Sequence, residues 1–186
     1  LSLRGRARWE GTPPKVVGGL GLVVPRWEGA RVDTETLRRA QGCLLGQLAG
    51  DALGQLVEFE SASTIARAYP QGVRDLADGG AWDTLAGQPT DDSEMALTLA
   101  RALVRDGAHD RDRVLELYTA WLDSPPFDVG GTTRAGIRGT PRTQSESNGS
   151  LMRVSPLGVW AHSMNDSAIA ALARAESAIT HPNVVC

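Results

Sequence analysis

The amino-acid sequence predicts an all-α fold. From Asp33 onward, apolar residues recur three and four positions apart, the spacing that places them on one face of a helix. Asp and Asn, whose side chains accept hydrogen bonds from free helix amides, stand directly before several of these runs. No stretch of the sequence shows the alternation of apolar and polar residues that is typical of a half-buried strand. Helices therefore account for all the regular structure that we expect.

The first predicted helix begins at Asp33, whose carboxylate can cap it. Its apolar residues repeat at helical spacing and are Leu37, Ala40, Leu44, Leu48 and Ala52. The same helix also carries a stripe of glycines four residues apart, which are Gly42, Gly46, Gly50 and Gly54. Each glycine costs about 1 kcal/mol of helix stability relative to alanine. We therefore expect another backbone or a ligand to approach this face closely.

Further helical segments follow the first. The segment after Asp92 has a wide apolar arc, which indicates a central helix. The segment after Asp110 must end before Pro125 and Pro126, because their rings cannot continue a helix. The expected segments are Asp92 to about Val104, Asp110 to the residue before Pro125, a short helix from Thr132 or Thr133, and the ranges 151–162 and 166–178.

The composition is that of one globular domain. The chain has 186 residues, 41% of them hydrophobic and 22% charged, which is enough to form a core. A formal net charge of -3 gives no electrostatic reason to expect nucleic acid or an anionic membrane as partner. Residues 1–32 are rich in Gly, Pro and Arg, and we interpret them as a flexible leader before a helical domain over 33–186.

Cysteine usage favours a reducing compartment. Cys43 and Cys186 are the only cysteines in the sequence, so it carries no disulfide framework. The start of the chain has arginines but no apolar segment of signal-peptide length, and no window is apolar enough for a membrane span. We therefore expect a cytoplasmic protein.

The stretch "PTDDSEM" places three oxygen side chains next to one another at a predicted helix start. Thr90, Asp91 and Asp92 are the hard ligands that suit Mg²⁺, Mn²⁺ or Ca²⁺. Acids also stabilise the positive end of a helix and cap its free amides. From this stretch alone, capping and metal binding both stay open.

Three more polar stretches lie where loops lead out of or into predicted helices. "GDALGQLVEF" delivers Glu58 where the first helical pattern fades, and "PFDVGGTTRAGI" places Asp128 in a Gly-rich turn. "SNGSLMR", over residues 147–153, puts small residues and free amides before a helix, where a phosphate would be stabilised. Together these junctions are one way to line a cleft in a helical bundle.

Taken together, the motifs resemble the ADP-ribosylglycohydrolase family, which includes the dinitrogenase reductase activating glycohydrolase. The similarity spans residues 37–183 and rests on "GCLLGQLAGDALGQLVEF", "TDDSEMAL", "FDVGGTTR", "SNGSLMR" and "THPN", in the family's order. The resemblance implies an orthogonal all-α bundle with a two-ion Mg²⁺ or Mn²⁺ centre. It also implies hydrolysis of the N- or O-glycosidic bond between ADP-ribose and a protein side chain, often arginine.

The resemblance assigns roles to particular residues of this chain. Thr90, Asp91 and Asp92 would be metal ligands. Glu58 would lie close to the metals and the scissile bond, and Asp128 near the leaving side chain; either acid could activate the attacking water. The ribose and diphosphate of an ADP-ribosylated protein, or of ADP-ribose itself, would contact Asn148, Gly149, Ser150, Met152 and His181.

The family completes its metal centre with a later Asp-x-Asp-Thr stretch, which does not follow Asn183. We therefore expect this chain to hold the N-terminal portion of the family's bundle, truncated and weakly active. The alternative is a non-catalytic module that binds ADP-ribose through the loop 148–152. Retention of Glu58, Asp91 and Asp92 favours the hydrolase, because a simple binding module would need fewer buried acids.

Overall fold

The computed structural model describes residues 32–186, so the predicted leader lies, apart from Val32, outside the described residues. Within that range the regular structure is helical, and the sole β feature is an isolated antiparallel bridge between Gly79 and Thr84. The all-α prediction is thus confirmed for these residues. The helices are α1 (Thr34–Gly54), α2 (Ala62–Ala68), α3 (Asp91–Asp106), α4 (Arg111–Asp123), α5 (Gly131–Ile137), the 3₁₀ helix η1 (Leu151–Arg153), α6 (Ser155–Trp160) and α7 (Asp166–Ser177).

Local capping explains where three of the helices begin. Asp33 caps α1, Asp110 caps α4 and Asn165 caps α7. In each case the side chain accepts a hydrogen bond from a backbone amide two or three residues downstream. These amides have no partner inside their own helix, so the cap stabilises the first turn. The predicted starts of these helices are confirmed.

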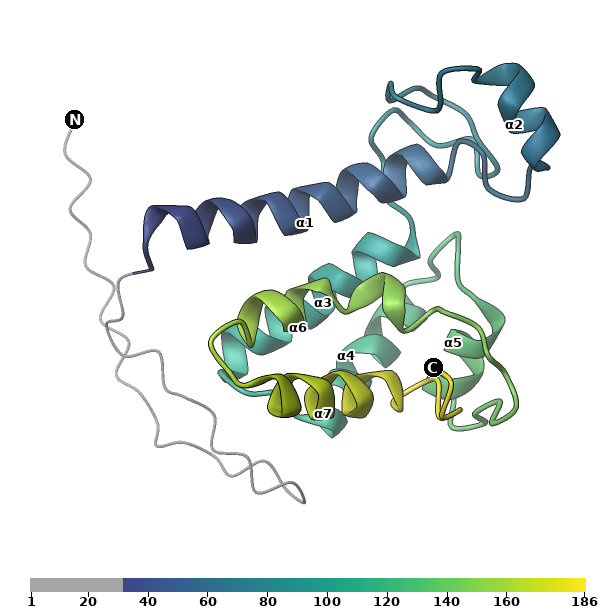
Figure 1. Cartoon of the computed structure of the whole chain (residues 1–186). Helices are drawn as coiled ribbons and strands as arrows, with labels where there is room; N and C mark the ends of the chain where they lie inside the picture. The colour runs from purple at the N-terminus through teal and green to yellow at the C-terminus, as the bar shows by residue number, and fades with distance from the viewer. Residues whose placement is uncertain (1–31) are drawn as a thin grey trace.

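α3 is the central helix of the fold. Its Met95 and Leu99 are fully buried, and Tyr118 of α4 and Leu157 of α6 are buried in the same core cluster. α7 packs against α6 from the other side. In Figure 1 these helices form a stacked body, and α1 lies across it, with α2 and its loops beyond the C-terminal end of α1.

α1 is far more exposed than the sequence predicts. It packs against α6 and α3, yet Ala52 is its only buried residue. A Cβ atom added at any glycine of the stripe, from Gly42 to Gly54, would meet no described atom within 4 Å. Within residues 32–186, the expected close approach of another backbone to this stripe is therefore wrong, and the alternative of a ligand there stays a prediction.

Two short segments differ from the prediction. α2 was not predicted, because its seven residues span barely two turns and show no clear apolar periodicity. The expected continuous helix over 151–162 is split into η1 and α6. Pro156 lies at the start of α6, and its ring would clash with the carbonyl of Met152 if an α-helix ran through. Proline therefore sets where α6 begins.

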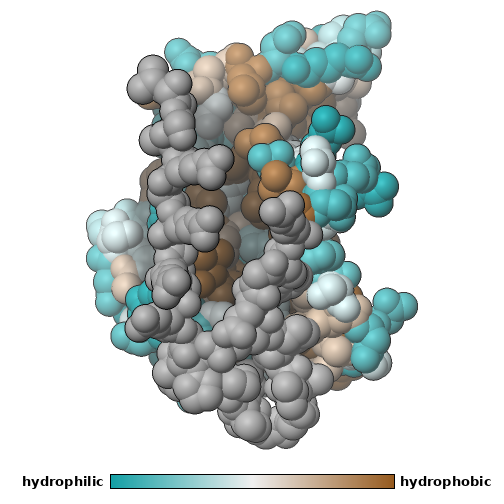
Figure 2. Space-filling model, turned by 90° about the vertical axis from the view of Figure 1, so that its left-hand side faces the viewer, coloured by the Kyte–Doolittle hydropathy of each residue, from teal (hydrophilic) through white to brown (hydrophobic). Residues whose placement is uncertain are grey.

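A largely apolar groove runs between the N-terminal half of α1 and helices α6 and α7. It has a volume of about 810 Å³, and Leu37, Ala40, Leu157 and Ile169 are among its lining residues. Figure 2 looks onto this side of the molecule and shows hydrophobic residues gathered in the hollow. Among the helices within residues 32–186, none is long and apolar enough to span a membrane.

Candidate functional site

Asp51, near the end of α1, caps α3 from outside that helix. Its Oδ2 accepts hydrogen bonds from Thr90 N at 3.0 Å, Ser93 N at 3.2 Å and Ser93 Oγ at 2.5 Å. Its Oδ1 accepts one from Thr90 Oγ1 at 2.7 Å. Thr90 occupies the N-cap position of α3 but makes no side-chain capping bond itself. Because Asp51 already caps α3, capping does not explain why carboxylates stand at positions 91 and 92.

Asp91 connects the start of α3 to the loop before α5. The side chain is buried, with only 6% of its surface exposed. Its Oδ2 accepts a hydrogen bond from Gly130 N at 3.3 Å, and its carboxyl group lies close to that of Asp128. Two acids that are 37 positions apart in the sequence, and that were singled out in two separate motifs, thus lie close together.

Burial raises the pKa of three acids in this region, and the charges of neighbouring acids add to the effect. Burial is the main cause of the raised pKa of Asp91, and Asp51 and Glu58 add to it. Burial, with the negative charges of Asp91, Asp51 and Glu58, raises the pKa of Asp92 to about 6. Burial, with Asp91 and Glu58 next in effect, raises the pKa of Asp128 to about 7. Desolvation and like charge both disfavour the ionised carboxylates here.

Glu58 lies in the turn that follows α1. Its Oε2 accepts a hydrogen bond from the indole Nε1 of Trp82 at 3.0 Å. Its charge acts on Asp91, Asp92 and Asp128. These four acids, all predicted as site residues, therefore gather in one region, which we call the carboxylate cluster. Trp82 was not predicted, because a single tryptophan in a Gly-rich loop carries no local signal.

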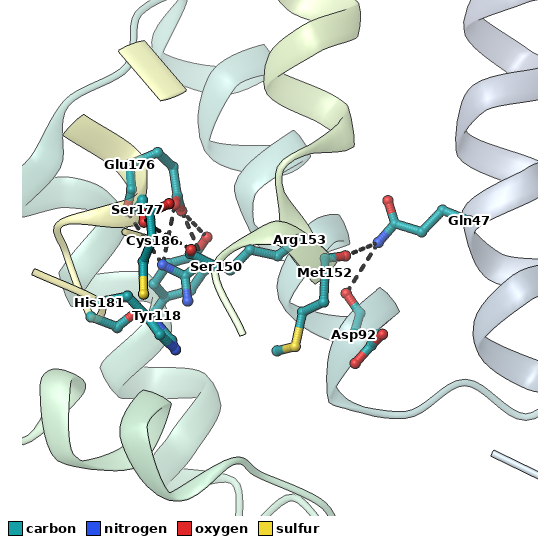
Figure 3. A network of polar contacts seen from close by, with 11 residues as sticks. Gln47, Asp92, Tyr118, Ser150, Met152, Arg153, Glu176, Ser177, His181 and Cys186 are labelled. Atoms are coloured by element: carbon teal, nitrogen blue, oxygen red, sulfur yellow. Dashed lines mark hydrogen bonds and ion pairs between the residues drawn. The ribbon is translucent and has the colours of Figure 1, made fainter. Parts of the chain in front are cut away.

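Gln47 ties the carboxylate cluster to the loop that leads into η1. Its Nε2 donates hydrogen bonds to the backbone oxygens of Asp92 at 3.2 Å and Met152 at 2.7 Å, as Figure 3 shows. Its Oε1 accepts a short hydrogen bond from the hydroxyl of Ser155. One amide side chain thus joins α1, α3 and η1. Gln47 and Asp51 stand four residues apart on α1, so they share one face, a spacing that the sequence analysis did not use.

Gly149 fits a space that no other residue could occupy without movement. A Cβ atom there would lie 2.9 Å from Thr133 Oγ1 and 3.0 Å from His181 Nε2. His181 is 1% exposed; its Nδ1 is hydrogen-bonded to Thr180 Oγ1 at 2.7 Å, while its Nε2 is buried without a partner. The predicted residues Gly149 and His181 therefore lie together, beside the first turn of α5.

The remaining predicted residues lie on the same loop but differ in exposure. Ser150 is buried and accepts a hydrogen bond from Ser177 Oγ at 2.8 Å. Met152 is half-buried and packs against the core, whereas Asn148 is exposed and its backbone oxygen accepts a hydrogen bond from Leu151 N. The loop is therefore fixed at Ser150 and Met152 and open at Asn148.

A buried ion pair holds this loop to α7. Arg153 and Glu176 are both 0% exposed and are joined by hydrogen bonds of 3.0 and 3.1 Å. Tyr118 donates to Glu176 Oε1 at 2.6 Å, and its ring lies 4.8 Å from the guanidinium of Arg153. Figure 3 shows this network beside Ser150 and His181. The loop that carries the predicted phosphate contacts thus rests on the core.

Residues 33–186 match the family model described as ADP-ribosylglycohydrolase. The chain belongs to the ADP-ribosylglycohydrolase family. Over 128 residues it is 43% identical to the ADP-ribosyl-[dinitrogen reductase] glycohydrolase of Rhodospirillum rubrum, covering 63% of this chain and 43% of that protein. Over 165 residues it is 32% identical to the ADP-ribosylarginine hydrolase Tri1 of Pseudomonas putida (strain GB-1), covering 77% of this chain and 43% of that protein.

A solved structure shows the same family fold. The chain of an ADP-ribosylglycohydrolase-related protein complex superposes with a TM-score of 0.69 at 28% sequence identity. The match covers 82% of this chain and 52% of that one. The chain therefore spans less than half the length of the two curated relatives and about half of the solved one.

The side chains at the start of α3 fit a hard divalent cation by their chemistry. Thr90, Asp91 and Asp92 offer oxygen atoms only, which suit Mg²⁺ or Mn²⁺. The neighbouring acids leave this region with an excess of negative charge. Among residues 32–186, no three His, Cys, Asp or Glu side chains are placed so that they could hold a metal ion together. The assignment of these three residues as ligands therefore stays a prediction.

Proposed function

We propose that this chain binds ADP-ribose and takes part in hydrolysing the glycosidic bond that joins ADP-ribose to a protein side chain, with arginine as the favoured side chain. The convergence of two separate regions carries this proposal. Asp91 contacts Gly130 in the loop before α5, and Thr133 of α5 contacts the backbone of Gly149 beside His181. The carboxylate cluster and the small-residue loop therefore border the same end of α5, as the two parts of a site for a sugar diphosphate should.

Thr90, Asp91 and Asp92 would hold Mg²⁺ or Mn²⁺, in a two-ion centre. When bound, such ions orient the ribose hydroxyls and polarise the reacting sugar. The rigid support comes from the chain itself. Asp51 fixes the first turn of α3 through its four hydrogen bonds, and Gln47 fixes the backbone oxygen of Asp92.

Glu58 and Asp128 are the two acids that could activate water. In the proposed reaction, water attacks the anomeric carbon of the ribose and the bond from that carbon to the side-chain nitrogen breaks. The water proton passes to the carboxylate, and the departing nitrogen regains a proton, which leaves ADP-ribose and free arginine. Glu58 accepts a hydrogen bond from Trp82, whereas Asp128 lies close to Asp91, so substitution of each acid tests a different part of the site.

The loop 148–152 supports binding of the ribose and diphosphate. Its backbone approaches α5 at Gly149, where a side chain would collide with Thr133 and His181. The unpartnered Nε2 of His181 is a buried polar atom, and a buried polar atom without a partner is costly unless a ligand or water satisfies it. Asn148 is exposed and free to contact a ligand through its side chain.

Calorimetric titration of ADP-ribose into the 186-residue chain, first with Mg²⁺ and then with EDTA, tests the proposal. We expect binding that requires Mg²⁺ and that Asp92→Asn weakens by at least about tenfold, since a metal ligand is lost. The exposed acid Asp112 of α4 provides the control, and Asp112→Asn should leave binding unchanged. Release of ADP-ribose from a peptide carrying ADP-ribosylarginine then tests hydrolysis, with Glu58→Gln and Asp128→Asn as variants.

The outcomes separate the candidate functions. Binding that survives EDTA and Asp92→Asn would instead support a non-catalytic ADP-ribose-binding module. Absence of binding by a folded chain would contradict both functions.

A further inference from the structure

Three aromatic side chains border the carboxylate cluster outside the core. Phe59, Trp82 and Phe127 are 81%, 37% and 42% exposed. Phe59 and Phe127 are the only two phenylalanines in the sequence, and the core cluster contains neither of them. We call these three residues the aromatic rim. Exposed aromatic rings that gather in one place mark a binding surface more often than isolated exposed residues do.

The rings of the aromatic rim contact one another around Trp82. The ring centroids of Phe59 and Trp82 are 6.3 Å apart, with an angle of 74° between the ring planes. Those of Trp82 and Phe127 are 6.1 Å apart, at 59°. The indole N–H of Trp82 is directed to Glu58, which fixes the ring beside that acid. Steeply inclined rings leave aromatic faces against which a flat group can lie.

The backbone holds the rim in place by unusual conformations. The turn that carries Trp82 is closed by paired hydrogen bonds between Gly79 and Thr84 at 2.8 and 3.0 Å. Gly80 has a φ of 77°, and a Cβ there would lie 2.6 Å from the carbonyl oxygen of Gln55, so the turn is pressed onto the end of α1. Phe59 has a φ of 65°, which costs a bulky residue stability and is typical of functional sites.

The charge beside the rim is negative. Asp128 follows Phe127 directly in the sequence, and Glu58 precedes Phe59. The charged groups that act most strongly on Asp128 are Asp91, Glu58 and Asp92, all of them acids. A ligand group that matches both the negative charge and the exposed rings must be cationic and must stack on aromatic rings. A guanidinium does both, because it is flat, always charged and weakly hydrated, whereas an ammonium is a compact and strongly hydrated charge.

We propose that Phe59, Trp82 and Phe127 form the seat for the guanidinium group of the side chain that carries ADP-ribose, and so determine specificity for arginine. This inference rests on the proposed function for its substrate. The aromatic faces contact the plane of the guanidinium, and Glu58 and Asp128 supply the opposite charge. Trp82 has a second role as a positioning residue, because its N–H orients the carboxylate of Glu58.

The test uses the ¹⁵N-labelled 186-residue chain and follows the indole N–H resonance of Trp82, assigned by its absence from Trp82→Phe. N-acetylarginine amide and N-acetyllysine amide are titrated as probes that carry the same charge. We expect the arginine probe to shift this resonance and to bind more tightly than the lysine probe. Phe59→Leu and Phe127→Leu should each weaken arginine binding by roughly two- to fivefold, the range for an exposed cation–π contact.

The control variant is Val104→Ala, which removes an exposed apolar side chain at the far end of α3, 78% exposed, and should change neither affinity. Equal affinity for the two probes, or arginine binding that both leucine variants leave intact, would overturn the seat. The titration uses neither ADP-ribose nor metal. If only the seat is wrong, the two probes bind equally while Mg²⁺-dependent ADP-ribose binding persists. If only the proposed function is wrong, the arginine probe is still preferred but ADP-ribose does not bind.

Discussion

Two sets of acidic side chains in this chain are treated by the fold in opposite ways. Glu176 is completely buried, and both carboxylate oxygens are hydrogen-bonded to Arg153 while one also accepts from Tyr118. Asp92 and Asp128 are partly exposed, and the charges that act on them are those of other acids. Glu176 thus has a positive partner inside the protein. For Asp92 and Asp128, no positive group acts as strongly as the neighbouring acids do.

This difference separates structural charge from functional charge. A buried carboxylate is tolerated when an Arg and a hydroxyl satisfy it, and it then fixes how two elements lie against each other. Acids that are crowded without such a partner destabilise the fold, so they are expected where a ligand supplies the missing positive charge. In the proposed site both groups act together. The Arg153–Glu176 pair holds the loop 148–152, and this loop and the carboxylate cluster border the same end of α5.

The largest expected effect is on the buried pair. Glu176→Gln leaves the guanidinium of Arg153 buried without its counter-charge, and we expect the free energy of unfolding to fall by about 3–5 kcal/mol. Asp123 and Arg138 form an exposed pair at 2.6 Å, and Asp123→Asn should cost less than about 1 kcal/mol. Urea denaturation at pH 7 measures both variants. Similar losses for the two would show that burial does not distinguish these pairs.

A smaller loss should follow from Tyr118→Phe. The variant keeps the ring over the guanidinium of Arg153 but removes the hydroxyl that donates to Glu176 at 2.6 Å. Burial raises the pKa of Tyr118 well above its usual value, so the hydroxyl stays a donor at neutral pH. Loss of a hydrogen bond to a charged group costs about 1.5–3 kcal/mol. The same denaturation series measures it, and a loss equal to that of Glu176→Gln would show that the hydroxyl of Tyr118 contributes as much stability as the ion pair.

Asp51 combines properties of both groups, because its charge acts on Asp91 and Asp92 while its hydrogen bonds support the fold. Asp51→Ala removes the acceptor for two backbone amides at the start of α3, and we expect a loss of about 1–2 kcal/mol. Asp33→Ala removes a cap from an exposed helix start and should cost about 0.5–1 kcal/mol. Thermal unfolding of both variants compares them. A variant of Asp51 as stable as the parent would show that the cap from α1 adds nothing.

The sequence predicts those features whose cause lies within three or four residues. The caps Asp33, Asp110 and Asn165 belong to this class, because one side chain acts on the adjacent turn. The helix start at Pro156 has an equally local cause, although one helix was expected over 151–162. Asp51 acts on amides about 40 positions away, so no local pattern reports it. The resemblance to a family singled out the acids that the fold brings together, since it draws on motifs rather than on periodicity.

The features that could not be predicted depend on how distant loops meet. Trp82 contacts Glu58 only because Gly80 lets its turn lie against Gln55. Gln47 joins α3 to η1 only because α1 crosses both. The glycine stripe shows the same limit. Helical spacing placed its members on one face of α1, but it carried no information on what lies opposite that face.

The smallest expected effect has the opposite sign. Asp92→Asn removes one charge from a set of mutually repelling acids, and the backbone oxygen that accepts from Gln47 is unchanged. In EDTA we expect the variant to be as stable as the parent or more stable, by up to about 1 kcal/mol. With excess Mg²⁺ the order should reverse, because an ion that binds only the folded parent stabilises it. Thermal unfolding in EDTA and in Mg²⁺ measures the difference in stability between variant and parent under each condition. A variant less stable than the parent in EDTA would show that Asp92 supports the fold directly and does not await a cation.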